Sequence, residues 1–272
     1  MGEQKSHRPL APYRTPGCLP LPQEILDFII DHLYEELATL QASCLVSKAW
    51  VQRVRKHLFA HIVLDTPDWS VHRWRETFPD PTNSPAHYVR ILSIRCPECI
   101  AAGIFDTPLT FHNVIHLDVD TSVYRSQIYP IPSHGIATVV RSLRLVSTSL
   151  TDTEVLNLVC SLPLLEDLAL ISQAPMALEP RARPRTSPRL TGSLELYVEG
   201  ELQSVIYRLL DLPNGLHFKR IVVRPLFYQD IEPVMDLVLR CSDTLESLSI
   251  VYPFSSVFHS IWTVPYPNLT FT

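Results

Sequence analysis

The sequence predicts a mixed fold, in which a small all-α module is followed by an α/β solenoid with parallel strands. Two observations lead to this prediction. An amphipathic helical pattern fills residues 19–62, and an apolar-x-x-apolar-x-apolar string then recurs seven times at steps of 25 to 27 residues. The chain has 24 prolines and only 7 glycines, so the segments between the strings are expected to be short elements with frequent breaks.

The helical module follows a tail, residues 1–18, that we expect to be disordered. The first helix opens after Leu21-Pro22, with Glu24 near its positive end. Its broad apolar face consists of Ile25, Leu26, Ile29, Ile30 and Leu33. A second helix is expected over Thr39–Leu45, and a third begins at Ser47 as its N-cap. The inward face of the third helix consists of Trp50, Val51, Val54 and Leu58. Three short helices make a small core, which predicts a partner that covers the remaining apolar surface.

The repeated string is typical of short parallel strands stacked in chain order. Its instances are Val89/Leu92/Ile94, Val114/Leu117/Val119, Val140/Leu143/Leu145, Leu165/Leu168/Leu170, Thr191/Leu194/Leu196, Phe218/Ile221/Val223 and Leu245/Leu248/Ile250. The last two apolar positions of each string point to one side of a strand, and the residues between them point to the other. Stacking successive copies therefore buries one continuous core.

The segments between the strings are expected to return the chain along the other side of the core, partly as helices. Thr151 and Glu154 have the spacing of a capping box before an apolar stripe that ends at Pro163. Further helices are expected over about residues 201–212 and 229–240. In this organisation residues 63–85 are a linker, residues 86–272 form the solenoid, and residues 174–189 form an exposed loop rich in proline and arginine. Residues 254–272 either fold over the last repeat or precede further repeats.

Both halves of the chain resemble known families. Leu21-Pro22-x-Glu24-Ile25-Leu26, Cys44-Leu45-Val46-Ser47-x-x-Trp50 and Leu58-Phe59 together resemble the F-box, over residues 19–62. The strings, over roughly residues 86–254, resemble leucine-rich repeats, and this combination is similar to divergent fungal F-box proteins. The position three residues after each string is not Asn or Cys as in that family. We therefore expect an irregular horseshoe without an asparagine ladder.

The F-box resemblance implies a substrate-recruiting adaptor of an SCF-type cullin ubiquitin ligase, in the ubiquitin-like conjugation pathway. The helical module would dock on the Skp-family adaptor and through it on a cullin. The implied contacts to that adaptor are Leu21, Pro22, Ile25, Leu26, Cys44, Leu45, Val46 and Trp50. The sequence does not divide these residues between docking and holding the three helices together.

The solenoid would bind a protein substrate, whose identity the sequence does not give, on its concave sheet face. The residues expected to contact it are His116, Asp118, Asp120, Arg144, Glu195, Tyr197, Arg220 and Arg224. This mixture of acidic, basic and aromatic side chains suits a protein or peptide better than a polyanion.

Two other functions stay open. A protein-interaction scaffold would use the solenoid without any ligase role. The spacing of Cys96, Cys99, His112 and His116 matches that of a zinc finger, which would make the chain a zinc-dependent nucleic-acid binder. That finger needs its two histidines on one helix, whereas Val114, Leu117 and Val119 belong to a strand string.

Composition and missing motifs narrow the remaining classes. No glycine-rich phosphate loop or nucleophile elbow occurs, so no enzyme activity, cofactor or metal is expected. The net charge of −5 and the lack of a long apolar segment favour neither nucleic acid nor membrane as a partner. The six cysteines fit reduced thiols, and no secretory signal is recognisable, so a cytoplasmic or nuclear location is expected. The N-terminal Met1-Gly2-x-x-x-Ser6 pattern leaves lipidation of Gly2 open.

Overall fold

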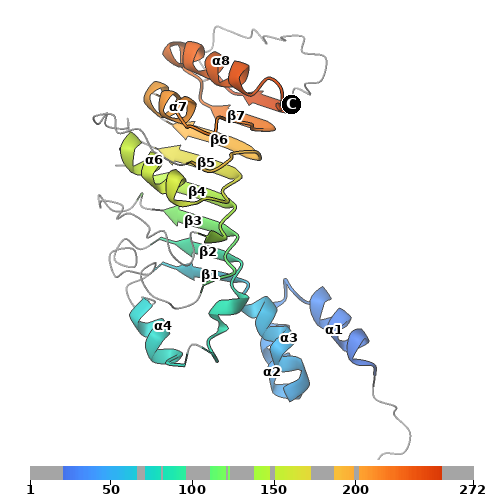
Figure 1. Ribbon diagram of the computed structural model, residues 1–272. Helices are drawn as coiled ribbons and strands as arrows, with labels where there is room; N and C mark the ends of the chain where they lie inside the picture. Colours follow the sequence, from blue (N-terminus) through green and yellow to red (C-terminus); the bar gives the residue numbers. More distant parts are fainter. Residues whose placement is uncertain are drawn as a thin grey trace, which may run out of the picture. The chain divides into compact units, whose positions relative to one another are not determined.

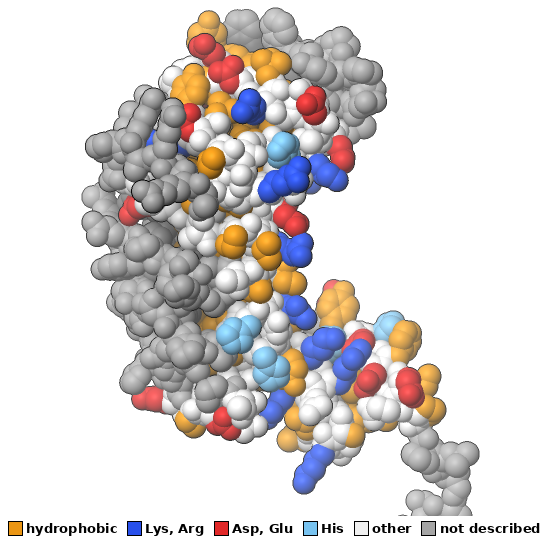
Figure 2. Space-filling view, viewed as in Figure 1, with side chains coloured by type: hydrophobic (Ala, Val, Ile, Leu, Met, Phe, Trp, Pro, Cys, Tyr) orange, Lys and Arg blue, Asp and Glu red, His pale blue; other side chains and the backbone are white. Residues whose placement is uncertain are grey.

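The computed structural model describes residues 21–65, 71–80, 82–95, 111–120, 122, 138–147, 151–172, 187–198 and 202–252; the others are drawn in grey in Figures 1 and 2. The chain divides into two compact units, Met1–Val54 and Arg55–Thr272. The first unit is helical in its described part. The second is an α/β unit built on a parallel sheet.

The helical unit contains α1 (Gln23–His32), α2 (Leu37–Val46) and most of α3 (Lys48–Leu58). As expected, α1 begins directly after Pro22, whose carbonyl accepts the Ile25 N–H at 3.1 Å. The hydroxyl of Ser47 accepts the Ala49 N–H at 3.3 Å, which confirms Ser47 as the cap of α3. The small core of this unit consists of Ile30, Leu40, Ser43 and Val54. The expected broad buried face of α1 is thus reduced to Ile30, with Leu26 and Leu33 half-buried.

The sheet of the second unit has eight parallel strands in chain order among the described residues (Figure 1). They are β1 (His61–Leu64), β2 (Ile91–Ile94), β3 (His116–Asp120), β4 (Ser142–Ser147), β5 (Asp167–Ser172), β6 (Ser193–Val198), β7 (Arg220–Arg224) and β8 (Ser247–Ile250). The middle residues of the seven strings lie side by side in register: Leu92, Leu117, Leu143, Leu168, Leu194, Ile221 and Leu248. The predicted strand pairing and register are therefore confirmed for β2 to β8.

The first strand lies where no strand was expected. Strand β1 pairs with β2 through Ile62 and Leu92, so the sheet begins inside the range assigned to the helical module and the linker. Helix α4 (Val71–Thr77) and a 3-10 turn (Pro85–Tyr88) occupy the rest of the supposed linker, 63–85. The step from Ile62 to Leu92 is 30 residues, longer than the later repeats, which hid this copy of the string.

Aromatic side chains close the β1 end of the core. Trp74 in α4 is buried, and its ring lies 4.9 Å from Phe78 and 5.7 Å from Phe111. Phe59 meets Trp74 and Phe78 edge-on, at 6.4 Å in each case. Such tilted and edge-on pairs are the favourable arrangements of aromatic rings. Phe59, which belongs to the residues that resemble an F-box, thus packs against the core of the sheet unit.

The returning segments include α6 (Asp152–Ser161), α7 (Gln203–Leu210), a 3-10 turn (Tyr228–Asp230) and α8 (Ile231–Arg240). Figure 1 shows α6, α7 and α8 on the same side of the sheet. The predicted capping box of α6 is confirmed, because Thr151 Oγ1 accepts the Glu154 N–H at 3.1 Å and Glu154 accepts the Thr151 N–H at 2.9 Å. The two further predicted helices correspond to α7 and α8.

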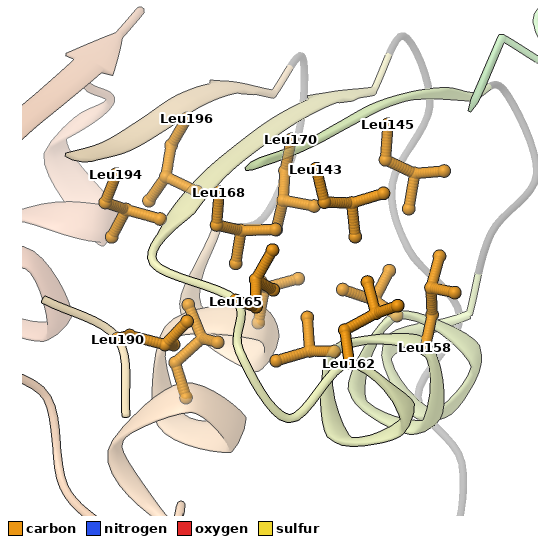
Figure 3. Close-up of a cluster of buried hydrophobic side chains, with 14 of the residues drawn as sticks. Leu143, Leu145, Leu158, Leu162, Leu165, Leu168, Leu170, Leu190, Leu194 and Leu196 are labelled. Atoms are coloured by element: carbon orange, nitrogen blue, oxygen red, sulfur yellow. The ribbon is translucent and has the colours of Figure 1, made fainter. Parts of the chain in front are cut away.

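The core lies between the sheet and these helices. Figure 3 shows Leu143, Leu145, Leu168, Leu170, Leu194 and Leu196 of the strands in one cluster with Leu158 of α6 and with Leu162, Leu165 and Leu190 of the connecting segments. All of these side chains are buried. Burial of a whole leucine side chain contributes about 1.5–3 kcal/mol, so this repeated apolar layer is the main source of stability of the α/β unit.

Polar side chains link successive returning segments at several positions. Asn113 donates to the His87 carbonyl at 2.6 Å, and Thr244 donates to the Phe218 carbonyl at 3.2 Å. In the same way, Asp230 Oδ1 accepts the Leu202 N–H at 3.1 Å. These bonds join residues 26 or 28 apart, which is about one repeat. They satisfy backbone groups of neighbouring copies.

Candidate functional site

The helical unit exposes an unusual amount of apolar surface. The large exposed side chains on and beside α1 and α2, here called the α1–α2 apolar surface, are Leu21, Ile25, Phe28, Ile29, Tyr34, Leu37, Leu45 and Val46. The exposed fraction reaches 61% for Phe28 and 89% for Leu45. Isolated exposed apolar residues are common, but eight large ones within 26 positions are more than scattered exposure usually gives.

The structure divides the eight expected adaptor contacts into two groups. Leu21, Pro22, Ile25, Leu45 and Val46 are exposed and belong to or adjoin the α1–α2 apolar surface. The other three, Leu26, Cys44 and Trp50, are half-buried. The first group is available to a partner, whereas the second group also helps to hold the helices together.

Four residues of this surface were not among the expected contacts: Phe28, Ile29, Tyr34 and Leu37. Ile29 belongs to the apolar face that was expected to be buried. The signal for Phe28 was the apolar character of α1 on a second face, since Phe28 lies outside the stripe that contains Ile30. Helix α2 has apolar residues all round, which is expected only of a helix that is covered on all sides. In the described residues its Leu40 is covered, while Leu37 and Leu45 are not.

An ion pair fastens α3 to α1. The Arg53 Nε donates to Asp31 Oδ1 at 2.6 Å, and a second guanidinium nitrogen binds Asp31 Oδ2. Asp27, one turn earlier in α1, lies 4.0 Å from the same guanidinium. The hydrogen bond to Asp31 raises the pKa of Arg53 above its ordinary value. This two-point contact fixes the crossing of two helices that share few buried side chains.

The second candidate site is the face of the sheet opposite the buried leucines, here called the open sheet face. All eight expected substrate contacts alternate with buried core residues, as the pattern in β3 and β6 shows. Asp118 is paired with Arg144 by strand register, and their side chains approach to 3.2 Å. Tyr197 is paired with Arg224, whose guanidinium lies 5.9 Å from the ring centre.

The expected contacts form two separate groups on this face. His116, Asp118, Asp120 and Arg144 lie on β3 and β4, whereas Glu195, Tyr197, Arg220 and Arg224 lie on β6 and β7. The intervening strand β5 presents Asp167, Ala169 and Ile171. In Figure 2, acidic and basic side chains are interspersed over the α/β unit, without a continuous field of one sign. Such a surface fits a protein ligand better than a polyanion.

Several acidic groups of the open sheet face have partners within the chain. Asp167 Oδ1 accepts the Ser193 N–H at 2.6 Å and its hydroxyl at 2.8 Å. Asp120 Oδ1 accepts the Ser122 N–H at 3.0 Å and its hydroxyl at 2.6 Å. These carboxylates are therefore engaged in holding the ends of strands and turns.

Strand β1 adds residues to this face that the sequence did not suggest. His61 opens β1, and its Nε2 lies 3.1 Å from the hydroxyl of Ser93. Ser93 itself is only 3% exposed, so its hydroxyl is held beneath the imidazole and is not accessible as a nucleophile. The pair extends the polar part of the open sheet face to the first strand.

Of the four residues with zinc-finger spacing, the two histidines lie within the described residues. His112 lies in a turn, and His116 is the first residue of β3, so the two imidazoles do not share a helix as a finger of this kind requires. Cys96 and Cys99 lie outside the described residues. No group of three or more His, Cys, Asp or Glu side chains within the described part could hold a metal ion.

Several other expectations also fall outside the described residues: the tail 1–18 with Gly2, most of the loop 174–189, and residues 254–272. Of the described cysteines, Cys44, Cys160 and Cys241 are free thiols. Burial raises the pKa of Cys160 to about 11 and also raises the pKa of Cys241. None of the helices in the described ranges is long and apolar enough to cross a membrane.

Comparison with known proteins gives no relative: no family model, no curated protein and no solved structure matches this chain.

Proposed function

We propose that the protein is a substrate-recruiting adaptor of an SCF-type cullin ubiquitin ligase. In this proposal the helical unit is an F-box-like module that docks on the Skp-family adaptor. The α/β unit is an irregular leucine-rich-repeat-like solenoid that binds a protein substrate on its open sheet face. The observation that carries the proposal is the α1–α2 apolar surface, which includes five of the residues taken from the F-box resemblance or directly adjoins them.

The physical argument concerns the size of the helical core. In the described part of this unit, residues 21–54, three large apolar side chains, Ile30, Leu40 and Val54, are buried, whereas eight are exposed. A module with more exposed than buried apolar side chains gains more stability from a partner that covers the exposed side chains than from its own packing. The covering surface must be largely apolar and must accept Leu45, which is 89% exposed.

A scaffold without a ligase role is the competing function. It would use the open sheet face in the same way but would give the α1–α2 apolar surface no partner. A zinc-dependent nucleic-acid binder has less support, since His112 and His116 lie on a turn and a strand and the chain carries a net charge of −5.

The test is binding of the purified full-length chain to a purified Skp-family adaptor, measured by titration calorimetry and gel filtration. Replacing both Leu21→Ala and Ile25→Ala removes two exposed contacts and is expected to weaken binding about tenfold or more, since each apolar side chain contributes roughly 1 kcal/mol when half of its surface is covered.

The matched control is Met235→Ala with Leu239→Ala, an exposed apolar pair on α8 of the other unit. This pair is expected to leave adaptor binding unchanged. No association between the adaptor and the folded full-length chain would overturn the ligase role and favour the scaffold.

A further inference from the structure

Strand β7 carries two exposed arginines on the open sheet face, Arg220 and Arg224, here called the β7 arginine pair. They are four residues apart on one strand, so their α-carbons are separated by about 13 Å and their side chains leave the sheet on the same face. Val222 lies between them and is only 1% exposed. The pair therefore flanks a position whose own side chain is already covered.

The charge of this pair has no carboxylate partner among the described residues. Asp118 pairs with Arg144 at 3.2 Å, and Asp167 accepts two hydrogen bonds from Ser193. Glu195 lies opposite Val222 in register, and is thus diagonal to both arginines, yet it forms no ion pair with either in the described part of the chain. Two further acidic side chains of the unit, Glu166 and Glu246, are paired with Arg141 at 2.7 Å and with Lys219 at 3.5 Å.

The neighbouring strands supply accessible apolar surface beside the β7 arginine pair. Tyr197 is half-buried beside Arg224, and Ile171 is half-buried beside Tyr197 on β5. An aromatic ring next to a guanidinium keeps that side chain oriented by a cation–π contact. The surface thus combines two positive charges, one of them oriented by an aromatic ring, with apolar contacts beside them.

We infer that the open sheet face at β6 and β7 binds an extended protein segment that carries two carboxylate side chains four residues apart. An extended segment lying along β7 presents residues i and i+4 on one side about 13 Å apart, which matches the β7 arginine pair. Each carboxylate accepts hydrogen bonds from one guanidinium, the arrangement that arginine favours. This assignment deepens the proposed function and rests on it, since it names the chemistry of the recruited substrate.

Charge complementarity here is local rather than general. The whole chain has a net charge of −5, so an acidic segment gains nothing from the protein as a whole and depends on the two arginines. The spacing of the acidic residues therefore decides binding more than their number does.

The test uses the full-length chain and synthetic fluorescent decapeptides, with binding measured by fluorescence anisotropy. The probe peptide carries two Glu four residues apart with Val midway between them. One control peptide has the two Glu two residues apart, a second has Gln in both places, and a third has phosphoserine in both places.

The probe peptide is expected to bind, and both unphosphorylated control peptides are expected to bind at least fivefold more weakly. Replacing Arg220→Gln with Arg224→Gln is expected to weaken binding of the probe about tenfold, as the loss of two partly exposed charge-assisted contacts implies. The matched variant, Arg90→Gln with Arg141→Gln, removes the same charge from exposed positions before β2 and β4, and is expected to leave binding unchanged.

Three results would overturn the inference. The first is no binding of the probe up to about 1 mM, a level at which even a weak contact of about 4 kcal/mol would be seen. The second is equal binding of the peptides with different spacing. The third is binding of the phosphoserine peptide alone, which would replace carboxylates by phosphate groups as the recognised chemistry.

The same variants are also titrated with the Skp-family adaptor. Loss of peptide binding with adaptor binding intact locates the effect at the sheet. Failure of adaptor binding with peptide binding intact would overturn the ligase role and leave the sheet site standing.

Discussion

The guanidinium of Arg53 in α3 binds both carboxylate oxygens of Asp31 in α1, and this contact joins two helices that have few buried side chains between them. Both side chains are about one-third exposed, so solvent screens the pair in part. Two-point contacts between Arg and a carboxylate hold geometry as well as charge. The pair is therefore important for how α1 presents the α1–α2 apolar surface.

Breaking this pair should loosen the helical unit. Arg53→Gln and Asp31→Asn are each expected to lower the stability of the unit by about 1 kcal/mol, and the double variant should lose little more than either single one. Amide hydrogen exchange of α1 and α3 measures the change unit by unit. Fully additive losses in this double-mutant cycle would show that the two side chains do not act together.

Gly192 makes a close approach at the start of β6 possible. A Cβ atom at this position would lie 2.2 Å from Asp167 Oδ1 and 3.1 Å from the Glu166 carbonyl oxygen. Gly192→Ala is expected to cost about 1–3 kcal/mol of unfolding free energy, measured by denaturant titration, because the Asp167 carboxylate must leave its bonds to Ser193. Adding Asp167→Ala removes the clash, so the double variant should be more stable than the sum of the two single changes predicts. Simple additivity would contradict the steric explanation.

Two adjacent leucines test whether the position of a leucine in the repeat decides how much it contributes to stability. Leu165 begins one of the predicted strings and is completely buried, whereas Leu164 is 47% exposed. Leu165→Ala is expected to cost about 2–5 kcal/mol, since it leaves a cavity between the sheet and α6. Leu164→Ala should change stability by no more than about 0.5 kcal/mol. Thermal and denaturant unfolding of both variants compare them directly, and equal effects would speak against the core shown in Figure 3.

The sheet could be predicted in detail because parallel stacking repeats one environment. Leu117, Leu143 and Leu168 occupy the same position in successive strands, so the same residue type recurs at a nearly constant step. Strand β1 was missed although Phe59, Ile62 and Leu64 form the same string. Its longer step and the overlap of Phe59 with the F-box-like motif concealed it.

The helical unit was predicted less completely, for a physical reason. The apolar stripe of α1 indicates which side chains avoid water, but not whether they meet the chain itself or a partner. Ile29 and Ile30 are adjacent and equally apolar, yet Ile30 is buried and Ile29 is 46% exposed. On the open sheet face, the alternation of side chains along a strand placed Arg220 and Arg224 correctly on one side. The contact between Asp118 and Arg144 was not predicted, because it depends on the register between two strands.

Cys160 in α6 provides a prediction about pH. Burial raises the pKa of its thiol from 9.0 to about 11, so the folded chain keeps the proton where the unfolded chain loses it. At pH 8 the folded thiol is therefore ionised about 100-fold less than the unfolded one, and alkylation by iodoacetamide, which requires the thiolate, should be slower by a similar factor. Mass spectrometry of the Cys160 peptide with and without denaturant measures this difference.

The same shift links Cys160 to stability at high pH. The unfolded state binds fewer protons than the folded state between about pH 9 and pH 11, so the contribution of this thiol to stability is complete below pH 9 and falls as pH rises through that window. Cys160→Ala removes the titrating group and should flatten the decline of stability in the same window, as measured by denaturant midpoints at a series of pH values. The contradicting result is an unchanged decline of stability with pH in this variant, together with rapid alkylation of the native thiol. It would mean that the Cys160 thiol is in contact with water. The packing of α6 against the sheet would then be looser than the burial of Leu158 and Leu162 indicates.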